Sequence, residues 1–186
     1  DPDEGLGVFA DELTAVDVSW ETIHAHKGEP IPSAEALIER GCLGLMVLGG
    51  PMSATDEEHF PFLREEVRLL RESLQRKLPM LNLCLGAQLL ARACDARLTI
   101  GGEKEIGWYS VSLIEWYTKR NPLFFQSPIE FTPFHWHCDS FDIPTEGYRL
   151  ARSDCYENQA LCINGNAYGV QFRPEVTEEM IAQWIE

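Results

Sequence analysis

Several features that would assign this chain of 186 residues to a protein class are missing from it. The cysteines form no CxxC pair, which argues against a structural zinc site or a thioredoxin-type redox site. Neither a GxGxxG nor a GK(S/T) motif occurs, so nucleotide binding is poorly supported. The longest mostly apolar run, residues 42–52, contains glycines and is too short to span a bilayer. No repeat of fixed period is present, which excludes a solenoid.

Positive charge is also scarce. Lysine and arginine number 15 against 30 aspartates and glutamates, which gives a formal net charge of −15. An acidic surface repels phosphate backbones, so we expect no nucleic-acid partner. We interpret the acidic surface as a source of solubility.

The six cysteines are interpreted as free thiols. An even number could form disulfides in a short secreted chain. However, a chain of this length can form a core without cross-links, and several cysteines lie within apolar runs. We therefore expect a cytoplasmic protein with reduced cysteines. Residues 1–186 are expected to form one domain. The chain has no initiator methionine and no signal peptide, so an upstream segment is expected to be missing.

Strands and helices are predicted to alternate through the first half of the chain. The runs 43–48 and 79–83 are apolar and predict buried strands. Residues 60–77 are amphipathic at helical spacing, and 85–94 are rich in helix formers. Ser33 is predicted to cap a short helix that ends at residue 40. This alternation indicates a parallel sheet covered by helices.

The second half predicts shorter strands, some of them paired as antiparallel hairpins. A helix over residues 178–186, capped by Thr177, is expected at the end of the chain. One further strand is expected near the start, over residues 16–23. The fold class is therefore α/β: a three-layer sandwich with a mostly parallel sheet and a small antiparallel extension. The later strands are predicted near residues 107–114, 129–135, 148–153, 159–163 and 168–172.

Residues 81–88, LNLCLGAQ, predict a nucleophile elbow at Cys84. An apolar strand leads directly into the cysteine, and a helix opens behind it. Such a turn is expected to point the thiol outward, and the helix N-terminus is expected to favour the thiolate. Gly86 would let the backbone turn without a side-chain clash. A buried, inert thiol is the competing interpretation, and the full pattern disfavours it.

This elbow resembles the nucleophile motif of class I glutamine amidotransferases. The family's other segments are matched in order and spacing, so the resemblance extends over residues 48–175. It implies the family's α/β fold and a reaction in which the cysteine attacks the side-chain amide of glutamine and forms a glutamyl thioester. The remaining matching segments are 48–53 (LGGPMS), 105–108 (EIGW), 134–141 (FHWHCDSF) and 169–175 (GVQFRPE).

The resemblance also implies individual roles. Cys84 is the expected nucleophile, and the backbone N–H groups of Gly50 and Leu85 are expected at the oxyanion. Gln88 is expected to face bound glutamine, with His137 and Asp139 near its α-amino and α-carboxylate groups. No cofactor and no metal ion are implied. A metal site at His135, His137, Cys138 and Asp139 is the less favoured alternative to a polar pocket wall.

At one position the chain departs from the family pattern. Arg173 stands where the family has its catalytic histidine, two residues before Glu175. On an extended segment both side chains point to one side, so Arg173 can face the thiol and pair with Glu175. An arginine stays charged at any working pH and cannot shuttle a proton. We therefore expect weak or absent glutaminase activity.

Three functions are compatible with these observations. The first is a glutamine-hydrolysing amidotransferase, impaired at the proton-transfer step and passing ammonia to a separate synthase chain. The second is a hydrolase of γ-glutamyl peptides or similar small molecules. The third is a catalytically silent member that binds a ligand or regulates a partner. No membrane partner is expected. A strand that precedes this region in the family is also missing, so its place is expected to lie outside this chain or to be taken by another segment.

Overall fold

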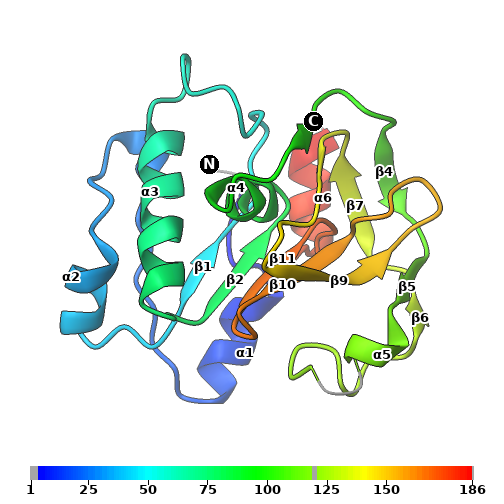
Figure 1. The fold of residues 1–186 in the computed structure, drawn as a ribbon, viewed down its shortest axis with the longest axis horizontal. Helices are drawn as coiled ribbons and strands as arrows, with labels where there is room; N and C mark the ends of the chain where they lie inside the picture. Colours follow the sequence, from blue (N-terminus) through cyan, green and yellow to red (C-terminus); the bar gives the residue numbers. More distant parts are fainter. Residues whose placement is uncertain (1–3, 119–120, 186) are drawn as a thin grey trace.

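The chain forms the α/β fold that was predicted, around a central sheet that is mixed rather than mostly parallel. The computed structural model describes residues 4–118 and 121–185 (Figure 1). In this part of the chain the central sheet has seven strands in the order β1-β2-β11-β10-β9-β5-β6. The helices are α1 (Val8–Ala15), α2 (Ala34–Glu39), α3 (Phe62–Gln75), α4 (Leu85–Ala93), α5 (Glu115–Thr118) and α6 (Glu178–Ile185), with a short 3₁₀ helix at Ala25–Lys27.

Three strands form the parallel part of the sheet: β1 (Leu45–Val47), β2 (Met80–Leu83) and β11 (Ala167–Val170). The predicted strands and the helix between them are confirmed. Along β1, Leu45 and Val47 contact the core under α3 and α4, whereas Met46 contacts the core on the other face. This alternation occurs because successive side chains of a strand point to opposite faces. Helices α3 and α4 cover one face, and α1 contributes Phe9 to the other.

The remaining sheet strands are antiparallel and form a larger extension than expected. β11 pairs with β10 (Ala160–Ile163), which pairs with β9 (Gly147–Arg152), followed by β5 (Val111–Leu113) and β6 (Glu130–Phe131). Two small two-stranded sheets complete the fold. One pairs β4 (Glu105–Trp108) with β7 (Phe134–His137), and the other pairs β3 (Leu98–Thr99) with β8 (Ser140–Phe141).

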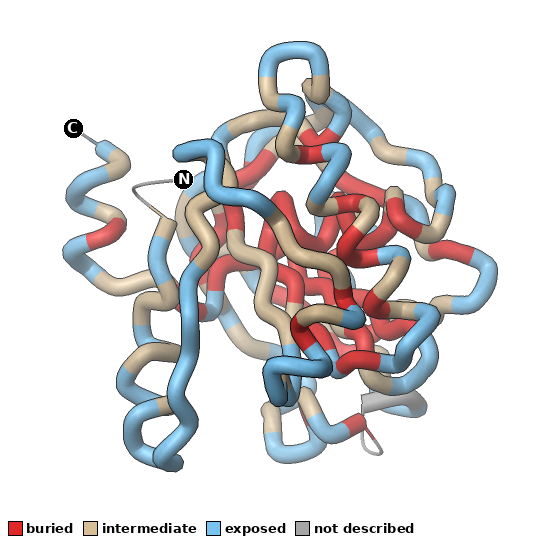
Figure 2. The backbone as a smooth tube through the Cα atoms, turned by 90° about the vertical axis from the view of Figure 1, so that its left-hand side faces the viewer, coloured by how far each residue is buried: buried red, intermediate tan, exposed pale blue. Residues whose placement is uncertain are grey.

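Buried residues gather at the centre of the molecule, with exposed residues around them (Figure 2). Residues 16–23, predicted as a strand, do not form one, so that prediction was wrong. Val16 and Trp20 are exposed, because no neighbouring strand or helix covers the apolar side of this segment. The unexpected helix α1 precedes it.

Caps were predicted more reliably. The Ser33 side chain accepts a hydrogen bond from the backbone N–H of Ala36 and opens α2, as expected. Thr177 Oγ1 accepts from the backbone N–H of Met180 at the start of α6. The predicted last residue of this helix, 186, lies outside the described residues. All six cysteines are free thiols. Among the described residues no helix is long and apolar enough to cross a membrane.

Candidate active site

Cys84 lies at the sharp bend between β2 and α4, where the sequence predicted an elbow. Its backbone has φ 50° and ψ −106°, a combination that a residue with a side chain rarely adopts. Strand β11 fixes this bend, because the Cys84 N–H donates to the carbonyl of Val170 on β11 at 2.8 Å. The Cys84 carbonyl in turn accepts from the N–H of Gln88 and starts the helix.

Gly86 lets α4 approach the sheet closely. A Cβ atom at this position would lie 2.3 Å from the carbonyl oxygen of Val47 on β1. Real side chains do not tolerate such a contact, so the residue that follows the elbow by two must be glycine if β1 is to stay in place. The elbow motif is therefore a packing requirement as well as a local turn.

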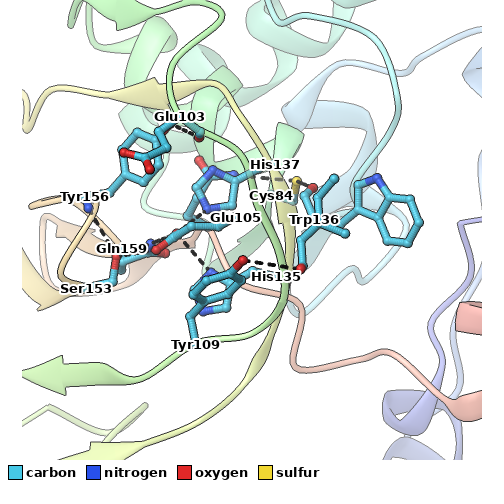
Figure 3. Close-up of polar contacts among 12 residues, drawn as sticks. Cys84, Glu103, Glu105, Tyr109, His135, Trp136, His137, Ser153, Tyr156 and Gln159 are labelled. Atoms are coloured by element: carbon cyan, nitrogen blue, oxygen red, sulfur yellow. Dashed lines mark hydrogen bonds and ion pairs between the residues drawn. The ribbon is translucent and has the colours of Figure 1, made fainter.

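The thiol of Cys84 is buried, contrary to the expectation that the bend points it outward. The residue is only 4% exposed. Its Sγ lies 3.8 Å from the carbonyl oxygen of Trp136, which can accept the thiol proton, and 3.6 Å from Nε2 of Gln171 (Figure 3 draws Cys84 beside Trp136). Main chain from β7 and a side chain that follows β11 thus cover the sulfur.

Arg173 pairs with Glu175, as predicted, and with a second carboxylate that the sequence did not indicate. Its Nε donates to Glu175 Oε1 at 2.6 Å, and both terminal nitrogens contact the carboxylate of Glu4. Arg173 Cζ also lies 4.6 Å from the ring centroid of Trp184, over its face. The guanidinium is almost fully buried, so these contacts hold it in one orientation.

The electrostatics around Cys84 oppose thiolate formation. Burial is the main cause and raises the pKa of the thiol to about 11, with Arg173 pulling it down and Glu4 and Glu175 pushing it up. The two carboxylates outnumber the single guanidinium, so the positive charge beside the sulfur is already compensated. The effect of the helix N-terminus, from which thiolate stabilisation was expected, is outweighed.

Burial acts on the two charged partners as well. It disfavours the charge of Arg173, but attraction to Cys84, Glu175 and Glu4 holds the pKa of the guanidinium above its ordinary value. Burial raises the pKa of Glu4, with Arg173 acting in the opposite direction. One oxygen of Glu175, Oε2, is buried without a hydrogen-bond partner. Two buried carboxylates therefore share one cation.

The loop after β1 contacts this group. A Cβ atom on Gly49 would lie 2.8 Å from Arg173 Cζ and 2.9 Å from Glu4 Oε2. A Cβ atom on Gly50 would lie 2.9 Å from Leu85 Cδ2. The structure thus brings Gly50 and Leu85, the two residues expected at the oxyanion, close to one another.

Gln88 and Asp139 also lie beside the elbow, although their polar atoms are engaged with the protein. Gln88 Nε2 donates to the carbonyl oxygen of Asp139 and to Oε1 of Gln171. The Asp139 carboxylate accepts from the Gly101 N–H at 2.8 Å and from the Ser53 hydroxyl at 3.0 Å. Asp139 therefore connects the segment that follows β3 to the loop that carries Gly50.

His137 points away from the sulfur and into a buried polar cluster with Glu105. The register of β4 and β7 places Glu105 directly opposite His137. His137 Nε2 lies 2.9 Å from Glu105 Oε2, and its Nδ1 lies 3.1 Å from the carbonyl of Asp139 (Figure 3). Ser153 and Gln159 donate to the two oxygens of the same carboxylate, at 2.7 and 2.6 Å.

The protonation of this cluster follows from its donors. A backbone carbonyl can only accept, so His137 Nδ1 carries a proton. Ser153 and Gln159 both donate to Glu105, which favours the ionised form of this carboxyl group. Burial works against the charge of Glu105, but contacts from His135, His137 and Ser153 outweigh it and hold the pKa well below its usual range. Glu105 and His137 thus form a buried hydrogen-bonded pair.

His135 completes a trio that has the donor types of a metal site, namely Glu105, His135 and His137. The trio includes Glu105 in place of the Cys138 and Asp139 of the alternative considered from the sequence. His135 Nδ1 lies 3.3 Å from Glu105 Oε2, although neither ring nitrogen makes a well-aligned hydrogen bond. A cation would have to displace the proton that joins His137 to Glu105. Hydrogen bonds within the protein thus engage Glu105 and His137, whereas both ring nitrogens of His135 are buried without a hydrogen-bond partner.

Sequence reasoning missed three residues at this site. Glu4 and Trp184 contact Arg173 from opposite ends of the chain, and neither lies in a recognisable motif. Gln171 could have been found, because it lies in the 169–175 segment two residues before Arg173, and residues at that spacing share a side of an extended chain.

Comparisons with known proteins show which family the chain resembles. The glutamine amidotransferase class-I family profile matches residues 10–183. The glutamine amidotransferase-like protein YfeJ of Salmonella typhimurium is 32% identical over 174 residues, which cover 91% of this chain and 69% of that protein. A glutamine-hydrolysing GMP synthase of Thermus thermophilus is 32% identical over 145 residues, which cover 76% of this chain but only 26% of the synthase.

A solved structure is similar over nearly the whole chain. The crystal structure of a glutamine amidotransferase from Thermotoga maritima superposes with a TM-score of 0.86 at 34% identity, covering 98% of this chain and 76% of that one. The fold, the elbow at Cys84 and these similarities lead to one conclusion: the chain belongs to the class-I glutamine amidotransferase family.

Proposed function

We propose that this chain is a glutamine amidotransferase domain that hydrolyses the side-chain amide of glutamine through a thioester on Cys84. The observation that carries the proposal is the elbow, which places the thiol at the start of α4 beside the loop that holds Gly50. Sγ attacks the amide carbon and the C–N bond breaks. Ammonia leaves with the proton that the thiol has lost, and water then breaks the C–S bond of the thioester, which releases glutamate and restores the thiol. The N–H groups of Gly50 and Leu85 would receive the oxyanion.

We further propose that the proton-transfer step is impaired. The guanidinium of Arg173 does not release a proton at working pH. Its charge is already compensated by Glu4 and Glu175. A thiol with a pKa of about 11 is ionised in about one molecule in 10⁴ at pH 7. Both the activation of Cys84 and the protonation of ammonia therefore lack the group that a histidine would supply.

The observed contacts suggest different roles near the substrate for Asp139, Gln88 and His137. Asp139 is the proposed contact to the α-amino group of glutamine, since its carboxylate lies on the segment beside the Gly50 loop. The Asp139 carboxylate also accepts from Gly101 and Ser53, but it has lone pairs left for a substrate. Gln88 and His137 hydrogen-bond to the Asp139 backbone carbonyl, so their proposed role is to position that segment. Ammonia would be used by a synthase activity. The similarity to a glutamine-hydrolysing GMP synthase supports such an acceptor reaction.

Glutamate release from glutamine tests both parts. The natural chain should release glutamate slowly, and Arg173→His should raise kcat by about 10²-fold or more. Arg173→Gln is the matched control, because it removes the guanidinium without supplying a group that relays protons. Cys84→Ser in the Arg173→His background should abolish release. Equal rates for the natural chain and Arg173→His would show that the arginine does not impair catalysis.

A silent binding member of the family is the second candidate, and the buried state of Cys84 favours it. A glutamine-analogue electrophile separates the two. Selective labelling of Cys84 supports the enzyme. Labelling of Cys84 no faster than of the other thiols, with no glutamate released by Arg173→His, supports the silent member.

A further inference from the structure

Gln171 is the side chain whose position the proposed reaction does not yet explain. It is fully buried and follows β11 directly, two residues before Arg173. Its Nε2 lies 3.6 Å from Cys84 Sγ, a normal separation for an N–H donor and a sulfur acceptor. Because an amide nitrogen and oxygen have nearly the same shape, the direction of this contact depends on the hydrogen bonds that orient the amide.

The backbone carbonyl of Asp139 orients the amide of Gln88. A carbonyl oxygen only accepts, so the group of Gln88 that faces it must be the NH₂ group. His137 Nδ1 fills the second lone pair of the same oxygen and carries a proton there. Turning the Gln88 amide over would place two oxygens against one another, so its orientation is settled by main chain rather than by another side chain.

Gln88 in turn orients Gln171. The same Nε2 of Gln88 donates to Oε1 of Gln171 at 3.2 Å. The oxygen of Gln171 is therefore directed at Gln88, and its NH₂ group is directed at the sulfur. The reverse orientation would place two NH₂ groups against one another. The donation from Gln88 to Gln171 and that from Gln171 to Cys84 thus run in one direction, toward the sulfur.

We propose that Gln171 is a further catalytic residue, whose Nε2–H stabilises the thiolate of Cys84 and is held in that direction by Gln88 and the carbonyl of Asp139. In the resting thiol, Sγ–H faces the carbonyl of Trp136. When the thiol loses its proton, the Trp136 carbonyl can no longer hydrogen-bond to the sulfur, because a carbonyl oxygen only accepts. The N–H of Gln171 then donates to a charged acceptor, which strengthens its hydrogen bond. This inference rests on the proposed function for its catalytic meaning, but the contact itself can be tested without turnover.

The test is the rate at which iodoacetamide labels Cys84 between pH 6 and pH 10, measured by mass spectrometry of the Cys84 peptide. Gln171→Met keeps the length of the side chain and removes the N–H. It should raise the pKa of the thiol by about one unit, which lowers the labelling rate about tenfold at every pH of this range. Gln171→Glu replaces the donor by an acceptor and should lower it further. Gln88→Met should lower it less, because the Gln171 amide then loses its orientation.

Cys162 is buried on β10, in the core cluster that also contains Leu150 and Val170. Its labelling rate is the internal standard, because it rises if the variant exposes the core generally. The proposal requires that Cys84 labelling falls relative to Cys162 in the same sample. An unchanged or faster rate at Cys84 in Gln171→Met would overturn it, because a packing residue can only open access when it is replaced. The result is independent of glutamate release by Arg173→His, so failure of the proposed function and failure of this inference are distinguishable.

Discussion

Glu4 and Arg173, 169 residues apart in the sequence, form a buried two-pronged ion pair beside the candidate nucleophile. The two residues act in opposite directions on the pKa of the Cys84 thiol, so their effects have to be considered together. Arg173 still lowers the pKa of the Cys84 thiol, but Glu4 and Glu175 act in the opposite direction. Two carboxylates therefore accompany the arginine and offset its attraction for a thiolate.

Replacing this carboxylate should activate the thiol. In Glu4→Gln the negative charge that raises the pKa of Cys84 is removed, and Arg173 stays paired with Glu175. We expect the pKa of the thiol to fall by about one unit, so that iodoacetamide labels Cys84 about tenfold faster at pH 8. The measurement is peptide mass spectrometry of labelled protein.

Glu12→Gln is the matched control for this change. Glu12 lies on the exposed side of the nearby helix α1, and its replacement alters the net charge by the same amount. Labelling of Cys84 in this variant should equal that in the natural chain. If both variants speed the labelling equally, the effect comes from net charge rather than from the Glu4–Arg173 pair.

Gly86→Ala should destabilise the fold, although alanine usually stabilises a helix by about 0.5–1 kcal/mol relative to glycine. Here the added Cβ would lie 2.3 Å from the Val47 carbonyl, so β1 or α4 must shift. Overpacking of this kind costs about 1–3 kcal/mol and exceeds the gain in propensity. Chemical denaturation measures the difference.

The comparison for this variant is Gly5→Ala. A Cβ atom on Gly5 would meet its nearest neighbour at 4.0 Å, an ordinary contact. Its free energy of unfolding should match that of the natural chain. A Gly86→Ala protein as stable as the natural chain would mean that β1 does not hold α4 as closely as described.

Glu66 on α3 should make stability depend on pH. Burial raises the pKa of its carboxyl from 4.5 to about 7. Between these values the folded chain binds more protons than the unfolded chain, so stability falls as the pH rises from about 4.5 to about 7. Glu66→Gln removes this dependence and should be more stable above pH 7 by about 1–3 kcal/mol, with the difference vanishing below pH 4.

Denaturant unfolding at pH 4, 6 and 8 checks this prediction. Glu58→Gln, at an exposed position that precedes the same helix, should show no such growing difference. A Glu66→Gln protein less stable at pH 8 than the natural chain would indicate a favourable partner for the carboxylate.

The elements around the elbow could be predicted because their signals are local. Residues 43–48 and 79–83 are apolar on both faces, which a strand buried between helices requires. Ser33 and Thr177 close helix ends with their own side chains. Residues 16–23 show the limit of such reasoning, because an alternating pattern forms a strand only where another strand pairs with it.

The pattern of residues 81–88 by itself determined where the chain bends and which sulfur lies at the bend, because strand, turn and helix preferences act between near neighbours. Only the tertiary structure decided what surrounds that sulfur. Glu4, Gln171 and the Glu105–His137 pair reach their places through contacts 32 to 169 residues apart. The pKa of Cys84 sums burial and all these charges, and such a sum depends on distances in space, which no local pattern contains.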